Sequence, residues 1–382
     1  TRYWRDWSSD VCSSDLLVIL GNLMKQYGDT YAPTIHHLTT MIMFSIIAHN
    51  DLETASYDIP QAFVQAPLPP HINKYISLSG PAKDAWLQHY PQDTDKVNPA
   101  GRLLIKLHKF LYGMKDAPNA FYKHLFATLS EKGYKVDFIS DKCLVYKAYP
   151  NSDYFIGIIH VDDILAAATS QSVINEFHEC IQNVYDSIPS NPMTNYVGFH
   201  LHRDRQNKTI YVDMPDKIEK LRSKFPDIQW NKSYQTPSDT DFFQSNSETL
   251  EPDKKTFLSK LQSLRYIAYK YRFDIHKEIA FLSTHSQNPS ISDTAKLNRV
   301  MIYLYRTKKL RLKIQPTSLQ PSIYVDASYG SHTSAVGHTG IVICIGGSPI
   351  FTISSKQKIV TLRSEEHTSE LQSRQYLVCR LL

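Results

Sequence analysis

Two adjacent aspartates, Asp162 and Asp163, stand between two strongly apolar segments. Carboxylates this close repel each other, and one resists ionisation unless a cation neutralises the pair. A hard, oxygen-liganded ion such as Mg²⁺ meets that need and leaves positions open for phosphate oxygens. Because phosphoryl transfer commonly uses two such ions, the pair predicts a two-metal site completed by a third carboxylate from another strand. The alternative is an acidic pair that merely caps a solvated turn.

The apolar segments on either side of the aspartates predict the element that carries them. Residues 154–161 and 164–169 are rich in apolar and β-branched side chains, which is typical of strands. We therefore expect a hairpin with the acids at its turn. Residues 113–133 contain Pro118 near their start, an apolar stripe and a closing Gly133, which predict a helix.

Further elements follow along the chain. Apolar residues at helical spacing predict a helix over 173–184, and residues 196–201 have the pattern of a short strand. The polar segment 236–254 contains two prolines and predicts a linker. Two helical stretches come after it, and residues 322–362 have a β-like pattern with a turn at Gly346–Gly347.

Three motifs, in order along the chain, resemble those of copia-type retrotransposon reverse transcriptases. Residues 57–63, Tyr-Asp-Ile-Pro-Gln-Ala-Phe, resemble the first carboxylate motif, and residues 109–121 resemble the Tyr-Gly-Leu-Lys-Gln-Ala-Pro box. Residues 160–164, His-Val-Asp-Asp-Ile, resemble the Asp-Asp box. The resemblance implies an α+β fold with a polymerase palm, partial fingers and thumb. It also implies RNA-directed DNA polymerase activity, in which deoxynucleotides are added to a primer 3′ end by two-metal phosphoryl transfer.

The resemblance implies a role for each matched residue. Asp58, Asp162 and Asp163 would be catalytic and would hold two Mg²⁺ ions, with Mn²⁺ as a substitute. Phe63 matches the aromatic residue that excludes a ribose 2′-hydroxyl, although an ordinary core Phe is the alternative. The other substrate-binding residues would lie beside the template base and incoming nucleotide or under the primer terminus: Tyr112, Gly113 and Val161. Residues 196–201 resemble the primer-grip turn, although a plain core hairpin explains them nearly as well.

A second, incomplete site resembles the start of a copia-type ribonuclease H. Residues 324–330, 338–342 and 354–358 match its opening strands, and Asp326 matches its first metal carboxylate. The family's next carboxylate motif does not follow Leu362. We therefore expect this region to lack a complete nuclease metal site.

Both ends of the chain resemble translated sequencing-library adapter. One oligonucleotide, read on opposite strands, can encode residues 363–382 and residues 1–15, although a genuine inverted repeat is the alternative. On the adapter interpretation, residues 1–16 and 363–382 are not native. The glutamates of the tail then have no catalytic role: Glu365, Glu366 and Glu370.

The remaining sequence divides into three expected regions. Residues 17–235 would be the reverse transcriptase, 236–320 a linker with connection helices, and 321–362 a partial ribonuclease H-like region. The basic fingers residues that clamp the incoming triphosphate would precede Leu17. Since the loss of one preorganised charge partner costs about 10²–10³ in rate, we expect little or no polymerase activity from this chain.

The composition fits this interpretation without requiring it. The chain has 382 residues, 42% of them hydrophobic, and a net charge of +5, which permits two or three domains and a weak attraction for polyanions. Five cysteines without a C-x-x-C pair disfavour a disulfide framework or a zinc site. Its expected partners are an RNA template, a DNA primer or product and deoxynucleoside triphosphates, with the oligomeric state left open.

The N-terminal half has no apolar stretch of bilayer-spanning length. The longest uncharged apolar segment there, 39–48, has about half of the ~20 residues that a bilayer-spanning helix needs. We therefore expect no membrane partner and an intracellular protein. By the resemblance, it would lie in a cytoplasmic particle or in the nucleus.

Other polar clusters suggest weaker hypotheses. The histidine pairs 36–37 and 200/202 lack the partners of a metal site, so we expect solvated or core side chains. The basic cluster 306–311 could contact a phosphate backbone or simply end a solvated helix. For the whole chain, the alternatives to a polymerase are a non-enzymatic nucleic-acid-binding remnant of the same fold and an unrelated metal-dependent nuclease or phosphotransferase.

Overall fold

The computed structural model describes residues 29–137, 139–185, 191–243, 249–328, 332 and 336–358. The chain divides into two compact units. The first is built mainly on Ile59–Gly133, and the second on Thr34–Asp58, Tyr134–Cys180 and most of the chain after residue 190. The described residues form helices and antiparallel sheets in separate segments, so the fold class is α+β, as the sequence predicts.

A five-stranded antiparallel sheet is the centre of the second unit. Its order is β1–β7–β6–β5–β4, so the first strand of the chain pairs with a strand more than 100 residues later. Strand β7 is buried from its second residue to its last, and three alanines at its end let elements pack closely on both faces. The strands, in spatial order, are β1 Glu53–Asp58, β7 Asp163–Ala168, β6 Tyr154–His160, β5 Leu144–Ala148 and β4 Lys135–Val136. The predicted hairpin is therefore confirmed as β6–β7.

Helices cover the two faces of this sheet. Helix α5, Gln171–Gln182, confirms the predicted helix and packs Phe177 against Phe155, with ring centroids 4.5 Å apart, and against Tyr57 at 5.5 Å. Helix α1, His37–Asn50, packs on the opposite face in the same apolar core as Leu165. Because side chains alternate along a strand, residues of β1 that neighbour Tyr57 point to the α1 side.

A buried carboxylate from another segment fixes the start of α1. Asp141 is only 4% exposed, and its Oδ2 accepts hydrogen bonds from the backbone N–H of His36 at 2.9 Å and from Thr39 Oγ1 at 2.7 Å. Its Oδ1 accepts a third from the N–H of Cys143 at 3.0 Å. Asp141 thus caps a helix that begins about a hundred residues earlier in the chain.

A four-stranded sheet, ordered β11–β10–β9–β8, lies in the same unit. The strand pattern of residues 196–201 predicts one strand, which is wrong, whereas the alternative of a core hairpin is confirmed. The chain turns at Val197 and Gly198, whose φ angles are 46° and 79°, between two strands that pair with each other. Two consecutive positive φ angles fit a tight hairpin turn, which the β-prone Val hides in the sequence. The strands are β8 Asn195–Tyr196, β9 Phe199–Asp204, β10 Thr209–Asp213 and β11 Leu312–Ile314.

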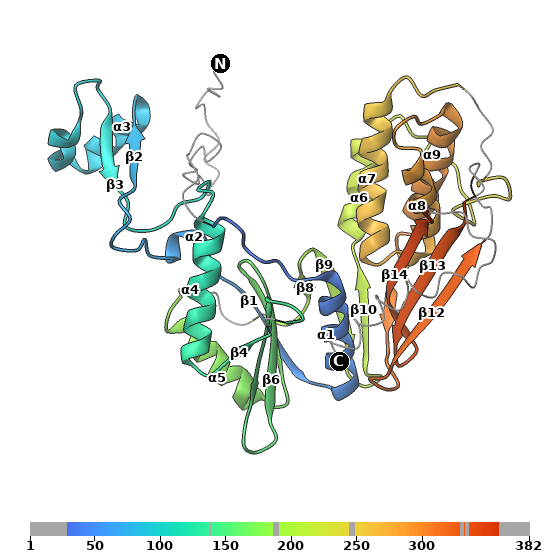
Figure 1. Cartoon of the computed structure of the whole chain (residues 1–382), viewed down its shortest axis with the longest axis horizontal. Coiled ribbons are helices and arrows are strands. Elements are labelled where there is room, and N and C mark those ends of the chain that lie inside the picture. Colours follow the sequence, from blue (N-terminus) through green and yellow to red (C-terminus); the bar gives the residue numbers. More distant parts are fainter. Residues whose placement is uncertain are drawn as a thin grey trace. The chain divides into compact units, whose positions relative to one another are not determined.

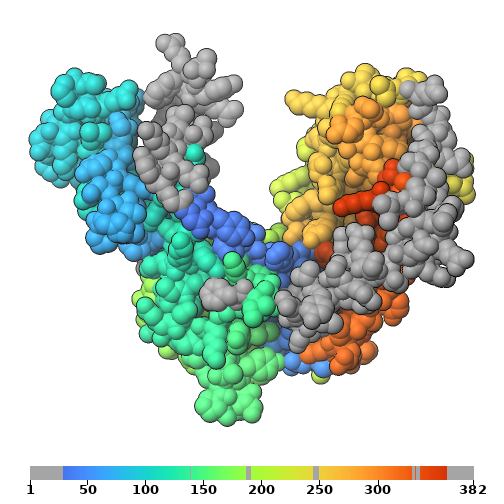
Figure 2. Space-filling view, viewed as in Figure 1, coloured from blue at the N-terminus to red at the C-terminus, as the bar shows by residue number. Residues whose placement is uncertain are grey.

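Four helices and a three-stranded sheet complete the second unit (Figure 1). The predicted helices after residue 254 are confirmed, and helix α8 lies on strand β14. Helices α7 and α9 pack together, and they appear yellow to orange in the space-filling view (Figure 2). The helices are α6 Pro215–Lys224, α7 Lys254–Lys270, α8 His276–Thr284 and α9 Ile291–Arg306. The sheet strands are β12 Pro321–Ser328, β13 His338–Ile345 and β14 Ser348–Lys356, with the predicted turn at Gly346–Gly347.

The first unit contains a small two-stranded sheet and the predicted helix near residue 118. Helix α4 spans Ala117–Glu131, has Pro118 in its first turn and is followed by Gly133 with a φ of 84°. A Pro at the start and a left-handed Gly past the end stop a helix at both sides. The other elements are α2 Ala62–Gln65, β2 Tyr75–Leu78, α3 Pro81–His89, the 3₁₀ helix η2 Pro91–Lys96 and β3 Leu103–Lys106.

Candidate active site

Strand register brings two of the predicted carboxylates together. Asp58, the last residue of β1, lies directly opposite Asp163, the first residue of β7. On the other side of β7, His160 of β6 also lies opposite Asp163. Directly opposed residues point to the same face with Cβ atoms about 4.5–5.5 Å apart, so His160, Asp163 and Asp58 form one row across three strands. The sequence motifs include His160 but do not indicate this position in the row.

The third carboxylate lies in the turn of the hairpin. Val161 and Asp162 connect β6 to β7, and Val161 has a φ of 60°. A β-branched residue rarely takes a left-handed conformation, because its side chain crowds the backbone. The pairing of the two long apolar strands therefore holds the turn in a strained shape, and such strain is often found at functional sites.

The carboxylates destabilise one another's charge. Burial raises the pKa of Asp162, and the negative charge of Asp58 raises it further. Burial, followed by the charges of Asp162 and Asp58, raises the pKa of Asp163 to about 6. Burial also lowers the pKa of His160, as does the positive charge of Lys270. Asp163 and the neighbouring Asp162 are therefore costly to ionise, and His160 beside them is held as a neutral imidazole.

No lysine, arginine or histidine of the described segments forms an ion pair with Asp58, Asp162 or Asp163. Within the same residues, no group of three or more His, Cys, Asp or Glu side chains is arranged to hold a metal ion. The donor set itself, three carboxylates without a protein counter-ion, is the type that Mg²⁺ binds.

The β8–β9 hairpin packs directly against the β6–β7 hairpin. Tyr196 is 3% exposed, and its hydroxyl donates a hydrogen bond of 3.3 Å to the carbonyl of Ile158 in β6. Burial, followed by the charge of Asp163, raises the pKa of Tyr196 well above its usual value. The hairpin formed by residues 196–201 is therefore a direct neighbour of the acidic row.

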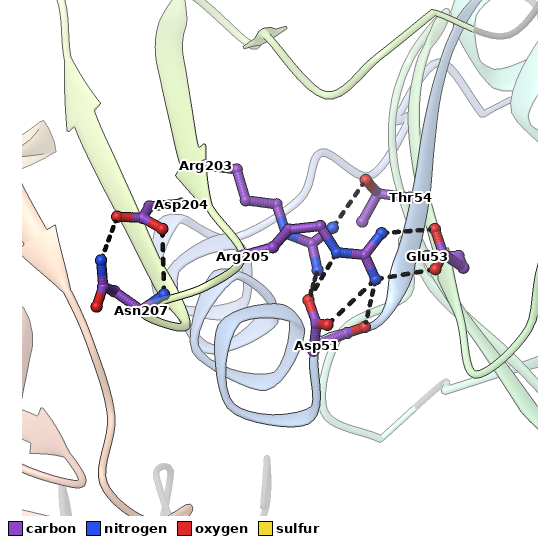
Figure 3. A network of polar contacts seen from close by, with 7 residues as sticks. All are labelled: Asp51, Glu53, Thr54, Arg203, Asp204, Arg205 and Asn207. Atoms are coloured by element: carbon purple, nitrogen blue, oxygen red, sulfur yellow. Dashed lines mark hydrogen bonds and ion pairs between the residues drawn. The ribbon is translucent and has the colours of Figure 1, made fainter.

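An arginine network ties this second sheet to strand β1 (Figure 3). Arg205 donates from Nε to Asp51 at 2.9 Å and from Nη1 to Glu53 at 3.0 Å, and its hydrogen bond lowers the pKa of Glu53. Arg203 donates from Nη2 to Asp51 at 2.8 Å and from Nη1 to the hydroxyl of Thr54 at 3.3 Å. Arg203 belongs to β9 and Arg205 directly follows that strand, so the network fixes the β8–β9 hairpin relative to the strand that ends at Asp58.

The predicted nucleotide-binding residues of the first unit are neighbours of one another. The ring centroids of Phe63 and Tyr112 are 5.0 Å apart, and Phe121 of α4 lies edge-on to Phe63 at 6.4 Å. Gly113 is exposed and has a φ of 87°, a conformation that side chains rarely tolerate. The structure therefore places Phe63, Tyr112 and Gly113 in one local cluster.

The carboxylate of the second predicted site lies on strand β12. Asp326 is exposed and pairs in register with Gly340 of β13. It lines a cavity of about 440 Å³ together with His276 and His338. The glutamates of the C-terminal tail and the segment 17–22 lie outside the described residues.

The remaining polar clusters have structural partners. Both histidines at 200 and 202 lie within ion-pair distance of Asp213, at 3.8 and 3.2 Å, and Arg311 binds the same carboxylate at 2.8 Å. Lys308 pairs with Glu219, and Arg306 donates hydrogen bonds to three backbone carbonyls. These contacts favour the structural interpretation of both clusters.

The comparisons with known proteins agree with the motifs. A family model described as reverse transcriptase (RNA-dependent DNA polymerase) matches residues 21–237. The chain is 23% identical over 363 residues to a retrovirus-related Pol polyprotein from transposon TNT 1-94 of Nicotiana tabacum, covering 92% of this chain and 26% of that protein. It is 27% identical over 257 residues to a Ty5-1 transposon protein of Saccharomyces cerevisiae, covering 66% of this chain and 82% of that protein.

A solved structure is also similar in part. A foamy viral protease–reverse transcriptase in complex with double-stranded DNA is 11% identical, with a TM-score of 0.46, over 93% of this chain and 52% of that chain. The chain spans about a quarter of the tobacco polyprotein. In the described part of the chain, no helix has the length and apolarity to cross a membrane.

The sheet with its acidic row thus belongs to a polymerase-type chain. More specifically, the chain belongs to the reverse transcriptase (RNA-dependent DNA polymerase) family, and its relatives are retrotransposon Pol polyproteins.

Proposed function

We propose that the acidic row and its turn form the active site of an RNA-directed DNA polymerase that adds deoxynucleotides to a primer 3′ end. The observation that carries the proposal is the direct opposition of Asp58 and Asp163 next to Asp162, with no cationic side chain of the described residues paired to them. The family model spans all three residues.

The donor set suits two divalent ions, Mg²⁺ or Mn²⁺, which would activate the primer hydroxyl and neutralise the leaving pyrophosphate. Asp58, Asp162 and Asp163 would hold these ions. The raised pKa of Asp163, about 6, means that its carboxylate is ionised at neutral pH at a cost that a bound cation would remove. Strain at Val161 would keep the turn fixed under the primer terminus.

The aromatic pair of the first unit would select the sugar and hold the base pair. We assign Phe63 to exclusion of a ribose 2′-hydroxyl, and Tyr112 with Gly113 to the template base and incoming nucleotide. The packing of Phe63 between Tyr112 and Phe121 supports this role, because a ring held on two sides cannot move away from a hydroxyl. The polymer partners would be an RNA template and a DNA primer or product.

Strands β12–β14 with Asp326 would be the opening part of a ribonuclease H-like region. As part of a retrotransposon polyprotein, the chain would act in a cytoplasmic particle or in the nucleus.

The test is DNA synthesis on a primed RNA template. We would compare this chain with a longer version that carries, before Leu17, the preceding segment of the tobacco relative. Both versions are assayed in Mg²⁺ or Mn²⁺, and the longer version should extend the primer. In the longer version, Asp163→Asn should remove synthesis and leave binding of the primed template intact.

Two outcomes would overturn the proposal. Binding of the primed template without extension by the longer version would favour a nucleic-acid-binding protein of the same fold. Cleavage of the template–primer by the chain without extension would favour a metal-dependent nuclease. Strong synthesis by this chain alone would support the assigned site.

A further inference from the structure

Lys270, the last residue of helix α7, occupies an unusual position for a lysine. It is half-buried, and its Nζ lies 5.2 Å from the ring centroid of Phe199 and 5.9 Å from that of Tyr266. No carboxylate of the described segments pairs with it, whereas several other lysines that are well covered do pair with a carboxylate. Those pairs are Lys74–Asp116, Lys147–Glu176, Lys260–Asp227 and Lys308–Glu219.

Packing holds Lys270 near the β6–β7 hairpin, which has Asp162 in its turn. Phe199 begins strand β9 directly after the Val197–Gly198 turn. A Cβ on Gly198 would lie 3.9 Å from the hydroxyl of Tyr266, so the end of α7 rests on this turn. The same β8–β9 hairpin is bonded to β6 through Tyr196 and Ile158. Only the β8–β9 hairpin thus separates Lys270 from the β6–β7 hairpin.

The surroundings of Lys270 favour an anion. Burial lowers the pKa of Lys270, so its charge sits in a partly dry environment where attraction to an anion is stronger than in water. Burial, followed by the charge of Lys270, lowers the pKa of the nearby His37 to about 3, so His37 adds no second positive charge at neutral pH. An incoming anion therefore meets one unpaired ammonium.

The positive charge continues from Lys270 along the neighbouring helices. A cavity of about 290 Å³ is lined by Tyr266 and by three lysines of α6, Lys217, Lys220 and Lys224. Tyr266 borders both this cavity and Lys270. Cations that recur along one surface match the regular phosphates of a nucleic-acid strand better than they match a single small anion.

We propose that Lys270 binds a backbone phosphate of the primer strand at the first or second linkage behind its 3′ end. The inference rests on the proposed polymerase function, and it adds a substrate contact from α7, which lies outside the region matched by the family model. Neither the motifs nor the spacing of the sequence identifies Lys270. It would position the strand whose 3′ hydroxyl reaches the acidic row.

The test is a binding cycle that needs no catalysis. Fluorescence anisotropy measures the binding of a primed RNA template to the full chain and to its Lys270→Gln variant, in Mg²⁺ and without nucleotide. In each primer of the series, a single phosphate linkage is replaced by a neutral methylphosphonate, and the position of that linkage differs from primer to primer. For the unmodified chain, neutralising the first or second linkage should weaken binding about tenfold, the loss of one charge-assisted contact. Lys270→Gln should weaken binding of the natural primer by a similar factor and then be insensitive to that one linkage.

Two further variants test whether the effect depends on a positive charge at position 270. Lys270→Arg should restore the sensitivity to that linkage. Lys255→Gln removes one exposed positive charge from the other end of α7, roughly 22 Å away, and should leave the pattern across linkages unchanged. The salt dependence should also lose about one unit of slope in Lys270→Gln. Circular dichroism and thermal melting confirm that each variant is folded.

The inference is overturned if Lys270→Gln binds the natural primer as tightly as the unmodified chain does. It is also overturned if both proteins show the same methylphosphonate profile at every linkage. Neither result bears on the proposed function, because primer extension and the effect of Asp163→Asn decide that function independently of Lys270. Failure of the proposed function would be seen separately, as loss of all preference for the primed template together with metal binding that is insensitive to Asp163→Asn.

Discussion

Asp163→Asn should stabilise the chain in the absence of divalent metal ions. The folded-state pKa of Asp163 is about 6 against 3.8 for the ordinary side chain, a difference of about two units. Each unit corresponds to about 1.4 kcal/mol, which would give about 3 kcal/mol for a fully buried group. Because Asp163 is only half-buried, solvent screening reduces the expected gain to about 1–2 kcal/mol.

The sign of the pH dependence follows from the raised pKa. Below pH ~4 the carboxyl is protonated in both folded and unfolded chains, so Asp and Asn should give nearly equal stability. As the pH rises from ~4 to ~6, the unfolded chain ionises first and the folded protein with Asp163 loses stability. The advantage of Asn should therefore grow over this interval and stay constant from pH ~7 upward.

Thermal melting measures this difference directly. Both proteins are dialysed against a chelator and melted at pH 4, 5, 6, 7 and 8. At pH 8 the variant should melt about 2–8 °C higher, since 1 kcal/mol shifts the melting temperature of a domain of 150–250 residues by about 2–4 °C. Addition of Mg²⁺ or Mn²⁺ should raise the melting temperature of the unmodified chain and leave that of the variant nearly unchanged. A variant that melts lower at pH 8, or a difference that does not change with pH, would refute the reasoning.

Three further changes probe the elements that position the site. Asp141→Ala leaves two buried donors, those of Thr39 and Cys143, and the part-buried N–H of His36 unpaired and should reduce the free energy of unfolding by about 2–4 kcal/mol, measured by urea denaturation. Gly113→Ala forces a side chain onto a φ of 87° and should cost about 1–2 kcal/mol in the same assay, and no loss would show that the turn relaxes freely. Phe63→Ala should raise incorporation of ribonucleotides relative to deoxynucleotides at least about tenfold in primer extension by the longer version, and an unchanged ratio would leave Phe63 as a core residue.

The sequence predicted the local elements of the site well, because their signals are local. Two apolar runs around an acidic pair specify a hairpin, and β6–β7 has its turn at Val161 and Asp162. Pro118 and Gly133 likewise bound helix α4. Periodicity and turn residues carry this information within about twenty residues of chain.

Local sequence patterns do not predict which distant strands pair or in which register. The pairing of Asp58 with Asp163 joins residues about a hundred positions apart, and only the motif resemblance suggested that they meet. The caps supplied by Asp141 and the position of Lys270 have no local signal, because they depend on how separate elements pack. The local strand pattern hides the turn at Val197 and Gly198, because Val has a strong β propensity and a single Gly is compatible with a strand, so only the family resemblance and the hairpin alternative indicated it.

Binding of Mn²⁺ tests the central claim most directly, because it asks whether Asp58, Asp162 and Asp163 act together as a metal site. Electron paramagnetic resonance reports the free Mn²⁺ that remains as the chain is titrated in the presence of a primed RNA template. The unmodified chain should bind Mn²⁺ at pH 8 and lose affinity as the pH falls below the Asp163 pKa of about 6, since protonation competes with the metal. Asp163→Asn should weaken Mn²⁺ binding at least about tenfold, because mutation of residues that only hydrogen-bond to metal ligands already lowers metal affinity about 10- to 100-fold. The control variant Asp326→Asn should leave Mn²⁺ binding unchanged. Equal binding by the unmodified chain and Asp163→Asn would contradict the account.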